Sequence, residues 1–301
     1  MFKGLAKGLL LLIITNIVIM VTFAVAMSVL QAFGIVPEGF VGYSAVSALV
    51  WGFGGAFLSL AMSRWVAKTF LGVKVIDPKS VSEYTWVVEM VHQQAKAAGL
   101  PKMPEVGIYE SPELNAFATG PSKSRALVAF SSGLLRAMPR EAVEGVSAHE
   151  VTHISNGDML AMTLLQGLVN AFAIFFARII GREVASRISD NSAVQMAAYY
   201  VIYIAAQILF MLLGSLIIAW FSRKREFRAD AGSAKIAGTN KMIAALEYLK
   251  QGANMEIPDE QRIPEGAAAL GISERGHSWM KAFATHPPLE ARIEALRTHQ
   301  R

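Results

Sequence analysis

Residues 147–153 read Ser-Ala-His149-Glu150-Val151-Thr152-His153, and this H-E-x-x-H run decides how the rest of the chain has to fold around it. On a helix, positions i and i+4 lie on one face, so both imidazoles can bind a single metal ion. Glu150 follows the first histidine and lies beside that ion, where it can act on a water molecule. The run is typical of zinc hydrolases.

The third metal ligand has to come from elsewhere, because a hydrolytic zinc takes three protein ligands and keeps one position for water. The chain has no Cys, so this ligand is a carboxylate or a His. Glu226 and Asp230 share one face of a predicted helix. Glu226 can bind the metal while Asp230 accepts the ring N–H of a liganding His. A solvated acidic pair that balances nearby arginines is the alternative, and the H-E-x-x-H run favours the metal. The other histidines have no sequence context for ligation: His92, His277, His286 and His299.

Four further residues are candidates for supporting roles, each with an ordinary alternative. Asp158, at the end of the first zinc helix, can orient a His, or it is a helix-terminal aspartate. Asn115 lies in a strand-like segment that can pair with an extended peptide, and it holds the substrate backbone or is a plain strand amide. His286 can donate to a developing oxyanion, with Arg292 bracing it. A surface His in a Pro-rich turn is the alternative, and the residues alone slightly favour it.

Composition predicts a membrane protein. The 301 residues are 53% hydrophobic and 17% charged, whereas a soluble domain has roughly 25% charged residues. The deficit lies in four uncharged runs, which predict four transmembrane helices: residues 9–33, 39–63, 159–177 and 191–222. The third run is just long enough to span, and a long buried helix is its alternative. The net charge of +5 comes mostly from basic residues that flank these runs, which indicates membrane anchoring rather than nucleic-acid binding.

Basic residues also predict the orientation. They precede the first run and follow the second and fourth, whereas the loop 34–40 has none. By the positive-inside rule, the soluble pieces 64–157 and 223–301 lie in the cytoplasm. One group does not fit this rule, namely Arg178, Arg182 and Arg187 after the third run. The predicted division is therefore a membrane hairpin, the first part of a soluble domain, a second membrane pair and the second part of that domain: residues 1–63, 64–157, 158–222 and 223–301.

Periodicity and turn residues predict the elements of the soluble pieces. Helices are expected over residues 81–98, 132–138, 139–157, 223–237 (continuing the fourth span), 240–251 and 288–298. Strands are expected over residues 104–109, 114–119 and 126–131. Residues 252–278 are rich in Gly and polar residues and read as a loop. The predicted fold class is a mostly α membrane protein with four transmembrane helices and an α+β soluble domain with a small β-sheet.

Four stretches together resemble the HtpX-type membrane metalloproteases, which are gluzincins related to the Ste-type prenyl-protein endopeptidases. They are Asn-Ala-Phe-Ala-Thr-Gly at 115–120, the H-E-x-x-H run with Asn-Gly-Asp at 156–158, Arg-Glu-Phe-Arg-Ala-Asp at 225–230 and Thr-His-Pro-Pro at 285–288. The similarity covers essentially the whole chain, and every zinc and base position is intact.

The resemblance implies a cytoplasmic zincin-like (gluzincin) protease domain that holds one Zn²⁺ through His149, His153 and Glu226, with Glu150 as base. It implies supporting roles for Asn115, Asp230 and His286. It also implies a multi-pass protein of the bacterial cytoplasmic (inner) membrane whose active site faces the cytoplasm. The expected activity is hydrolysis of peptide bonds in misfolded or damaged membrane proteins, as part of stress response and membrane quality control. The expected partners are polypeptide substrates and the lipid bilayer, with no nucleic acid.

Two alternatives stay open at this point. A prenyl-protein processing protease shares the same site, although the short N-terminal membrane part argues against a large enclosed membrane chamber. An inactive membrane scaffold is the non-enzymatic alternative. It predicts disruption of the base or of a ligand, and the sequence has all four residues.

Overall fold

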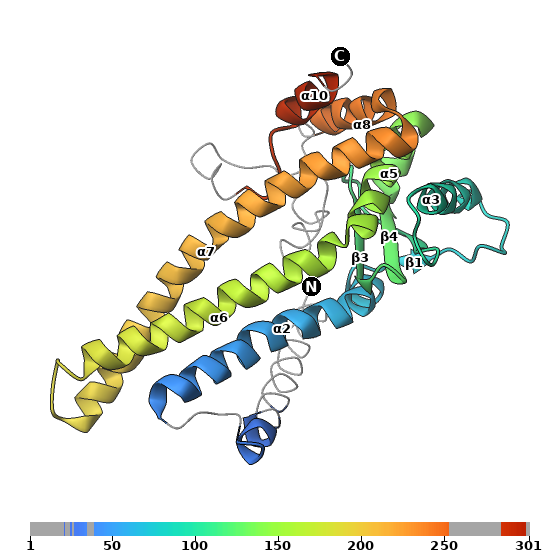
Figure 1. The fold of residues 1–301 in the computed structure, drawn as a ribbon. Helices are drawn as coiled ribbons and strands as arrows, with labels where there is room; N and C mark the ends of the chain where they lie inside the picture. The colour runs from blue at the N-terminus through green and yellow to red at the C-terminus, as the bar shows by residue number, and fades with distance from the viewer. Residues whose placement is uncertain (1–20, 22–24, 26, 35–38, 253–283, 299–301) are drawn as a thin grey trace. The chain divides into compact units, whose positions relative to one another are not determined.

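The structure is a computed structural model that describes residues 21, 25, 27–34, 39–252 and 284–298 (Figure 1). The chain divides into two compact units. One comprises Met1–Ser59 and Thr163–Ser215, and the other comprises Leu60–Met162 and Leu216–Arg301. Most of the first predicted span and all but the first residue of the predicted loop 252–278 lie outside the described residues, and Gly252 is the last residue of a helix.

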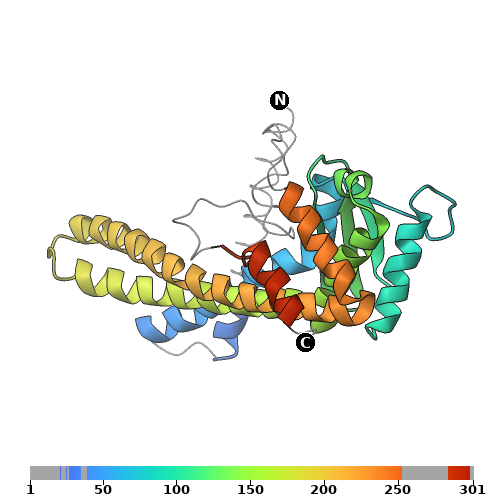
Figure 2. The same cartoon turned by 90° about the horizontal axis from the view of Figure 1, so that it is seen from above.

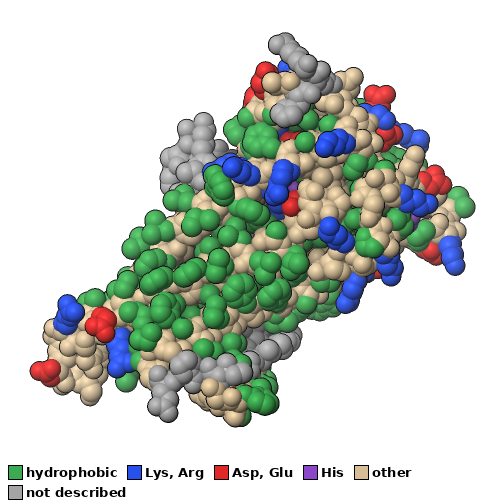
Figure 3. All heavy atoms as spheres, viewed as in Figure 1, with side chains coloured by type: hydrophobic (Ala, Val, Ile, Leu, Met, Phe, Trp, Pro, Cys, Tyr) green, Lys and Arg blue, Asp and Glu red, His purple; other side chains and the backbone are tan. Residues whose placement is uncertain are grey.

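Three helices in the described part of the chain are long and apolar enough to cross a membrane: α2 (Phe40–Phe70), α6 (Asp158–Ala185) and α7 (Ser192–Ala237). They correspond to the second, third and fourth predicted runs. Large apolar side chains remain exposed along them, and Figure 3 shows hydrophobic side chains over the surface of α6 and α7. Examples are Leu160, Leu164, Leu168 and Phe172 on α6, and Ile204, Ile208 and Leu212 on α7. This exposure suits lipid contact and speaks against the alternative of α6 as a buried helix.

Small residues allow close helix packing within the first unit. A Cβ on Gly52 of α2 would lie 2.5 Å from the backbone nitrogen of Ala171 on α6. A Cβ on Gly167 would lie 2.5 Å from the ring of Phe53. Without a hydrophobic driving force between helices in lipid, such close approach supplies the van der Waals contact that holds them together.

The second unit contains a four-stranded sheet with the order β1-β2-β4-β3. Strand β2 (Glu105–Tyr109) runs parallel to β4 (Arg125–Ser131), whereas β3 (Ala116–Ser122) is antiparallel to β4. These three strands were predicted from the sequence. The two-residue strand β1 (Lys74–Val75) was not, because a strand this short carries no periodic pattern.

The sheet alternates its side chains between two apolar layers, as the period of a strand requires. Val106, Val128 and Phe130 join the main core, whereas Phe117 and Leu127 face a smaller cluster with Ala67 at the end of α2. The main core is built from these strands and the helices α3 (Thr85–Ala97), α5 (Arg140–Asn156), α8 (Thr239–Gly252) and α10 (Leu289–Thr298), which Figures 1 and 2 show.

Helix bounds follow from local chemistry. Ser131 caps the short helix α4 (Ser132–Ala137) by accepting the N–H of Leu134 at 3.0 Å. Helix α5 ends at Gly157, whose φ of 73° is a left-handed C-terminal cap. The predicted helix 81–98 was too long at its start, because the N–H of Thr85 is bonded to Ser82 in a turn and the helix begins only there.

Two close contacts fix α5 against its neighbours. A Cβ on Gly145 would lie 2.4 Å from the carbonyl oxygen of Lys241 at the start of α8. A Cβ on Gly232 of α7 would lie 2.3 Å from Cγ2 of Thr152 on α5. Ser233 adds a hydrogen bond of 2.8 Å to the carbonyl oxygen of Gly145. These contacts set the register of α7 along α5.

We predict that Gly232→Ala destabilises the second unit. The helix propensity of Ala favours folding by about 1 kcal/mol, but the overlap with Thr152 costs roughly 1–3 kcal/mol. Thermal unfolding in detergent should show a lower midpoint. The double variant Gly232→Ala/Thr152→Ala removes the overlapping methyl group and should recover at least part of the loss. Equal midpoints for the single and double variants would contradict the packing argument.

Candidate metal centre

The H-E-x-x-H run lies in the second half of α5, and the structure brings its two imidazoles together. Their Nε2 atoms are 3.0 Å apart, with the ring planes at 88° to one another. Val146, Val151 and Ile154 anchor this part of α5 in the main core. The i, i+4 spacing therefore places both nitrogens at one point, on a helix that has little freedom to move.

The third member of the cluster is Glu226 of α7, whose side chain is 0% exposed. Its Oε2 lies 3.4 Å from Nε2 of His149, and its Oε1 lies 3.4 Å from Nε2 of His153. One ligand atom from each of the three residues lies within 4.8 Å of the others. Two motifs far apart in the sequence thus meet in one buried cluster.

The cluster suits a small divalent ion. Metal–ligand bonds of about 2.0–2.2 Å in a tetrahedron separate the ligand atoms by roughly 3.3–3.6 Å, close to the spacings above. Oε2 of Glu226 is buried with Nδ1 of His286 at 3.1 Å and Nη1 of Arg292 at 3.6 Å, and a carboxylate at such depth is costly unless positive charge meets it. Burial opposes charge on His149, but Asp230 and Glu226 raise the pKa of its imidazole to about 9. The surrounding carboxylates therefore favour positive charge at this point.

A carboxylate lies against the Nδ1 atom of each imidazole, on the side away from the cluster. Oδ1 of Asp230 lies 3.0 Å from Nδ1 of His149. Oδ2 of Asp158 lies 2.6 Å from Nδ1 of His153. Each carboxylate accepts the Nδ1–H, so the lone pair of Nε2 points into the cluster. Asp158 can reach back to His153 because the left-handed Gly157 turns the chain between α5 and α6.

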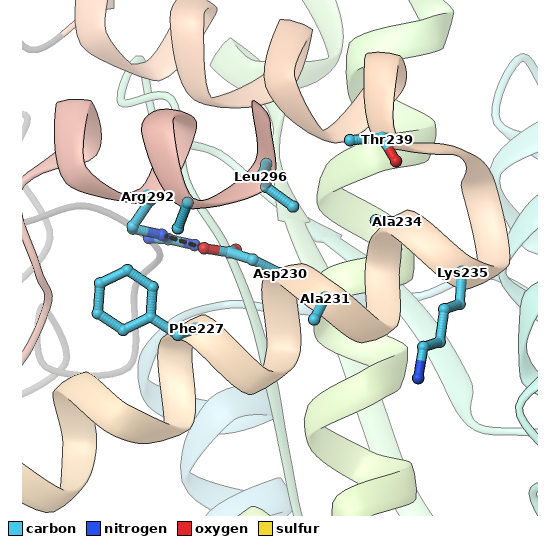
Figure 4. Close-up of a pocket in the computed structure, with 9 residues that line it drawn as sticks. Phe227, Asp230, Ala231, Ala234, Lys235, Thr239, Arg292 and Leu296 are labelled. Carbon is cyan, nitrogen blue, oxygen red and sulfur yellow. Dashed lines mark hydrogen bonds and ion pairs between the residues drawn. The ribbon is translucent and has the colours of Figure 1, made fainter. Parts of the chain in front are cut away.

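Arg292 of α10 supplies a buried positive charge to this network, and its side chain is 0% exposed. It donates to both oxygens of Asp230, from Nε at 2.8 Å and from Nη2 at 2.7 Å, as Figure 4 shows. Its Nη1 also lies 3.6 Å from Oε2 of Glu226. The sequence suggested that Arg292 braces His286. These contacts show it holding the two acidic residues of α7, and the bracing of His286 stays a prediction.

Glu150 is buried beside the histidines. Burial raises the pKa of its carboxyl group, and the neighbouring His149 and His153 oppose that shift. The backbone of Ala118 in β3 is also among the groups that lower the pKa of this carboxyl group. The carboxyl group thus lies beside the imidazole pair, where it can exchange a proton with a water molecule.

The two remaining candidates are both buried, and His286 contacts the cluster. His286 is 8% exposed, and its Nδ1 lies 3.1 Å from Oε2 of Glu226, so it is not the surface histidine that the sequence alone favoured. Asn115 is buried just before β3. Its backbone is tied to Ser131, which donates its N–H to the Asn115 carbonyl at 2.9 Å and accepts the Asn115 N–H on its hydroxyl at 3.2 Å.

Arg225 is a further residue at the cluster that was not predicted as part of the site. Nη2 of Arg225 lies 3.2 Å from Oε1 of Glu226, and its position next to the acidic residue was the only signal available. His92 is away from the cluster, with Nε2 3.1 Å from the carbonyl oxygen of Pro104. His277 and His299 lie outside the described residues.

The fold and the site define the class of protein, a membrane-bound metalloprotease. A model described as peptidase family M48 matches residues 82–300. The chain belongs to peptidase family M48, and within it to the HtpX-type proteases. It is 48% identical to "Protease HtpX" of Shewanella pealeana over 297 residues, covering 97% of this chain and 100% of that protein. It is also 48% identical to "Protease HtpX" of Shewanella loihica over 295 residues, covering 97% and 99%.

A solved structure shares the fold. The crystal structure of S. mikatae Ste24p superimposes with a TM-score of 0.59 at 17% sequence identity, covering 94% of this chain and 66% of that one. At this identity the likeness concerns the fold alone. It agrees with a mostly helical chain that carries a small mixed sheet.

We predict that Asp158→Asn weakens metal binding with little effect on folding, because it removes the charge that holds the His153 ring. Loss of such a partner typically lowers metal affinity by roughly 10–100-fold. Metal content after equilibration with a competing chelator measures the effect. Asp190→Asn removes an exposed aspartate and serves as the matched control. Unchanged affinity in Asp158→Asn would show that this contact does not support the cluster.

Proposed function

We propose that the chain is a zinc-dependent endopeptidase that holds one Zn²⁺ through His149, His153 and Glu226. The observation that carries this proposal is the convergence of three buried ligand atoms within 4.8 Å of one another. Two imidazoles and one carboxylate, with no thiolate, are the ligand set of hydrolytic rather than structural zinc sites. A position for water remains, as hydrolysis requires.

Bound zinc would supply Lewis acidity, which polarises the scissile carbonyl and lowers the pKa of water toward about 7. Side chains of the protein carry out the proton transfer and orient the metal ligands. Glu150 takes the proton of the attacking water and passes it to the nitrogen of the leaving amine. Asp230, Asp158 and Arg292 keep the two imidazoles oriented during this transfer.

We propose that strand β3, Asn115 and His286 position the substrate. Strand β3 is the last in the sheet order, so an extended peptide can add to it by main-chain hydrogen bonds. Asn115 precedes this strand and is our candidate for holding the substrate backbone. His286 lies within 3.1 Å of a ligand oxygen, close enough to stabilise the oxyanion that forms on the scissile carbonyl.

We predict that Glu150→Gln retains zinc but loses peptide hydrolysis by about 100-fold or more, the usual scale for a general base. Zinc analysis and cleavage of an unfolded casein-type substrate in detergent measure the two properties separately. Glu141→Gln alters an exposed glutamate of the same helix and should leave both unchanged. Wild-type cleavage by Glu150→Gln would refute the base assignment, and loss of zinc from it would give the carboxylate a ligand role instead.

We further propose that the natural substrates are misfolded or damaged membrane proteins, cleaved as part of membrane quality control under stress. This assignment rests on the resemblance of the whole chain to HtpX-type proteases. An unfolded protein and a prenylated C-terminal peptide, offered to the same preparation, separate this activity from prenyl-protein processing. Preferential cleavage of the prenylated peptide would favour the processing activity.

For topology, we propose four spans in the bacterial cytoplasmic membrane, with residues 64–157 and 223–301 forming one protease domain on the cytoplasmic side. The support is the distribution of basic residues, which follow the second and fourth spans and are absent from the loop 34–40. Residues 1–63 and 158–222 form the two membrane hairpins in this arrangement.

The absence of Cys makes this topology directly testable by labelling, because the parent chain gives no background. We expect Ser80→Cys to resist a membrane-impermeant maleimide in spheroplasts and to react after lysis. Ser186→Cys, in the stretch between the third and fourth spans, should react in both. Both serines are exposed in the structure, so each variant controls for the reactivity of the other. Labelling of Ser80→Cys before lysis would invert the orientation.

A further inference from the structure

Two of the three arginines that break the positive-inside pattern, Arg178 and Arg182, lie on one face of α6. Arg178 and Arg182 are four residues apart, so they share a face of the helix. At 1.5 Å per residue, Arg178 lies about 30 Å along α6 from Asp158, which is the thickness of a hydrocarbon core. Arg178 therefore reaches the opposite headgroup level from the end of α6 that begins at Asp158.

Both arginines contact the first turns of α2. Nη1 of Arg178 donates to the hydroxyl of Ser47. The guanidinium of Arg182 stacks on the ring of Phe40, 4.2 Å from its centroid. Phe40 and Ser47 lie two turns apart on one face of α2, and Ser44 lies between them on that face. The first unit therefore places the two arginines and Ser44 together.

This group of side chains has positive charge and no acidic partner among the described residues. Neither Arg178 nor Arg182 forms an ion pair with a carboxylate there. The hydroxyl of Ser44 is 1% exposed and has no hydrogen-bond partner. The N-terminal end of α2 adds positive potential through the helix dipole. A charge at the edge of the lipid core requires a counter-ion.

We propose that Arg178, Arg182 and Ser44 form a binding site for the phosphate of an anionic phospholipid. The two guanidinium groups bind the phosphate oxygens, and the acyl chains lie along the exposed apolar faces of α6 and α7. This role accounts for basic residues on the side of the membrane where the positive-inside rule disfavours them. The site belongs to the membrane unit and does not depend on the proposed zinc chemistry.

The test compares lipid binding by the full-length chain, in a Glu150→Gln background so that no sample digests itself. Native mass spectrometry of the protein in detergent counts retained phosphatidylglycerol against phosphatidylcholine. We expect selective retention of phosphatidylglycerol, with apparent affinity reduced roughly fivefold by loss of each arginine in Arg178→Gln and Arg182→Gln. Arg187→Gln removes the same charge from an exposed position beyond α6 and should bind as the parent does.

Three further measurements complete the design. Arg178→Lys keeps the charge and should retain selectivity, which separates charge loss from misfolding. Phosphatidylglycerol should raise the thermal midpoint of the parent but not of the double variant Arg178→Gln/Arg182→Gln, whereas inorganic phosphate alone should raise neither. Equal retention of both lipids by the parent, or equal loss in Arg187→Gln, would overturn the proposal. Stabilisation by inorganic phosphate alone would assign the site to a free anion instead.

Discussion

Four buried carboxyl groups surround the two imidazoles of α5. In the described part of the chain, the guanidinium of Arg292 is the single buried arginine side chain that can balance their negative charge. The carboxyl groups belong to Glu150, Asp158, Glu226 and Asp230. Buried charge of one sign is destabilising unless it is compensated. Asp230 is neutralised by its paired hydrogen bonds to Arg292, which leaves an excess of negative charge where the Nε2 atoms meet. A divalent cation at that point would complete the balance, so the residues proposed to hold the metal would also make metal binding part of folding.

This electrostatic arrangement depends on holding α7 against α5, although a pair of membrane-length helical segments separates their sequences. The contact of Gly232 with Thr152 and the hydrogen bond from Ser233 to Gly145 fix the two helices in register. Glu226 lies upstream of these contacts on the same rigid helix. Its carboxylate therefore reaches the histidines by virtue of packing elsewhere, and a shift of α7 by one residue would carry it away from them.

Local patterns in the sequence were enough to predict much of this structure. The i, i+4 spacings of His149 with His153 and of Glu226 with Asp230 each define a helix face, and Pro139 and Gly157 delimit α5. The three longer strands and the long apolar helices follow from periodicity and composition. What escaped prediction are contacts between residues far apart in sequence. Nothing local to Arg292 indicates that it pairs with Asp230, and nothing local to His286 indicates that it is buried against Glu226. Such pairings arise only when helices from different parts of the chain pack together.

The position of β3 at the end of the sheet has a consequence for selectivity under the proposed function. The edge of a strand binds a peptide through its main-chain amide groups, which every polypeptide has. Binding of this kind therefore depends little on the side-chain sequence of the peptide. A native domain pairs most of its amides internally and presents few of them. Under the proposed function, discrimination between folded and unfolded substrates can thus rest on conformation, with no consensus motif at the cleavage point.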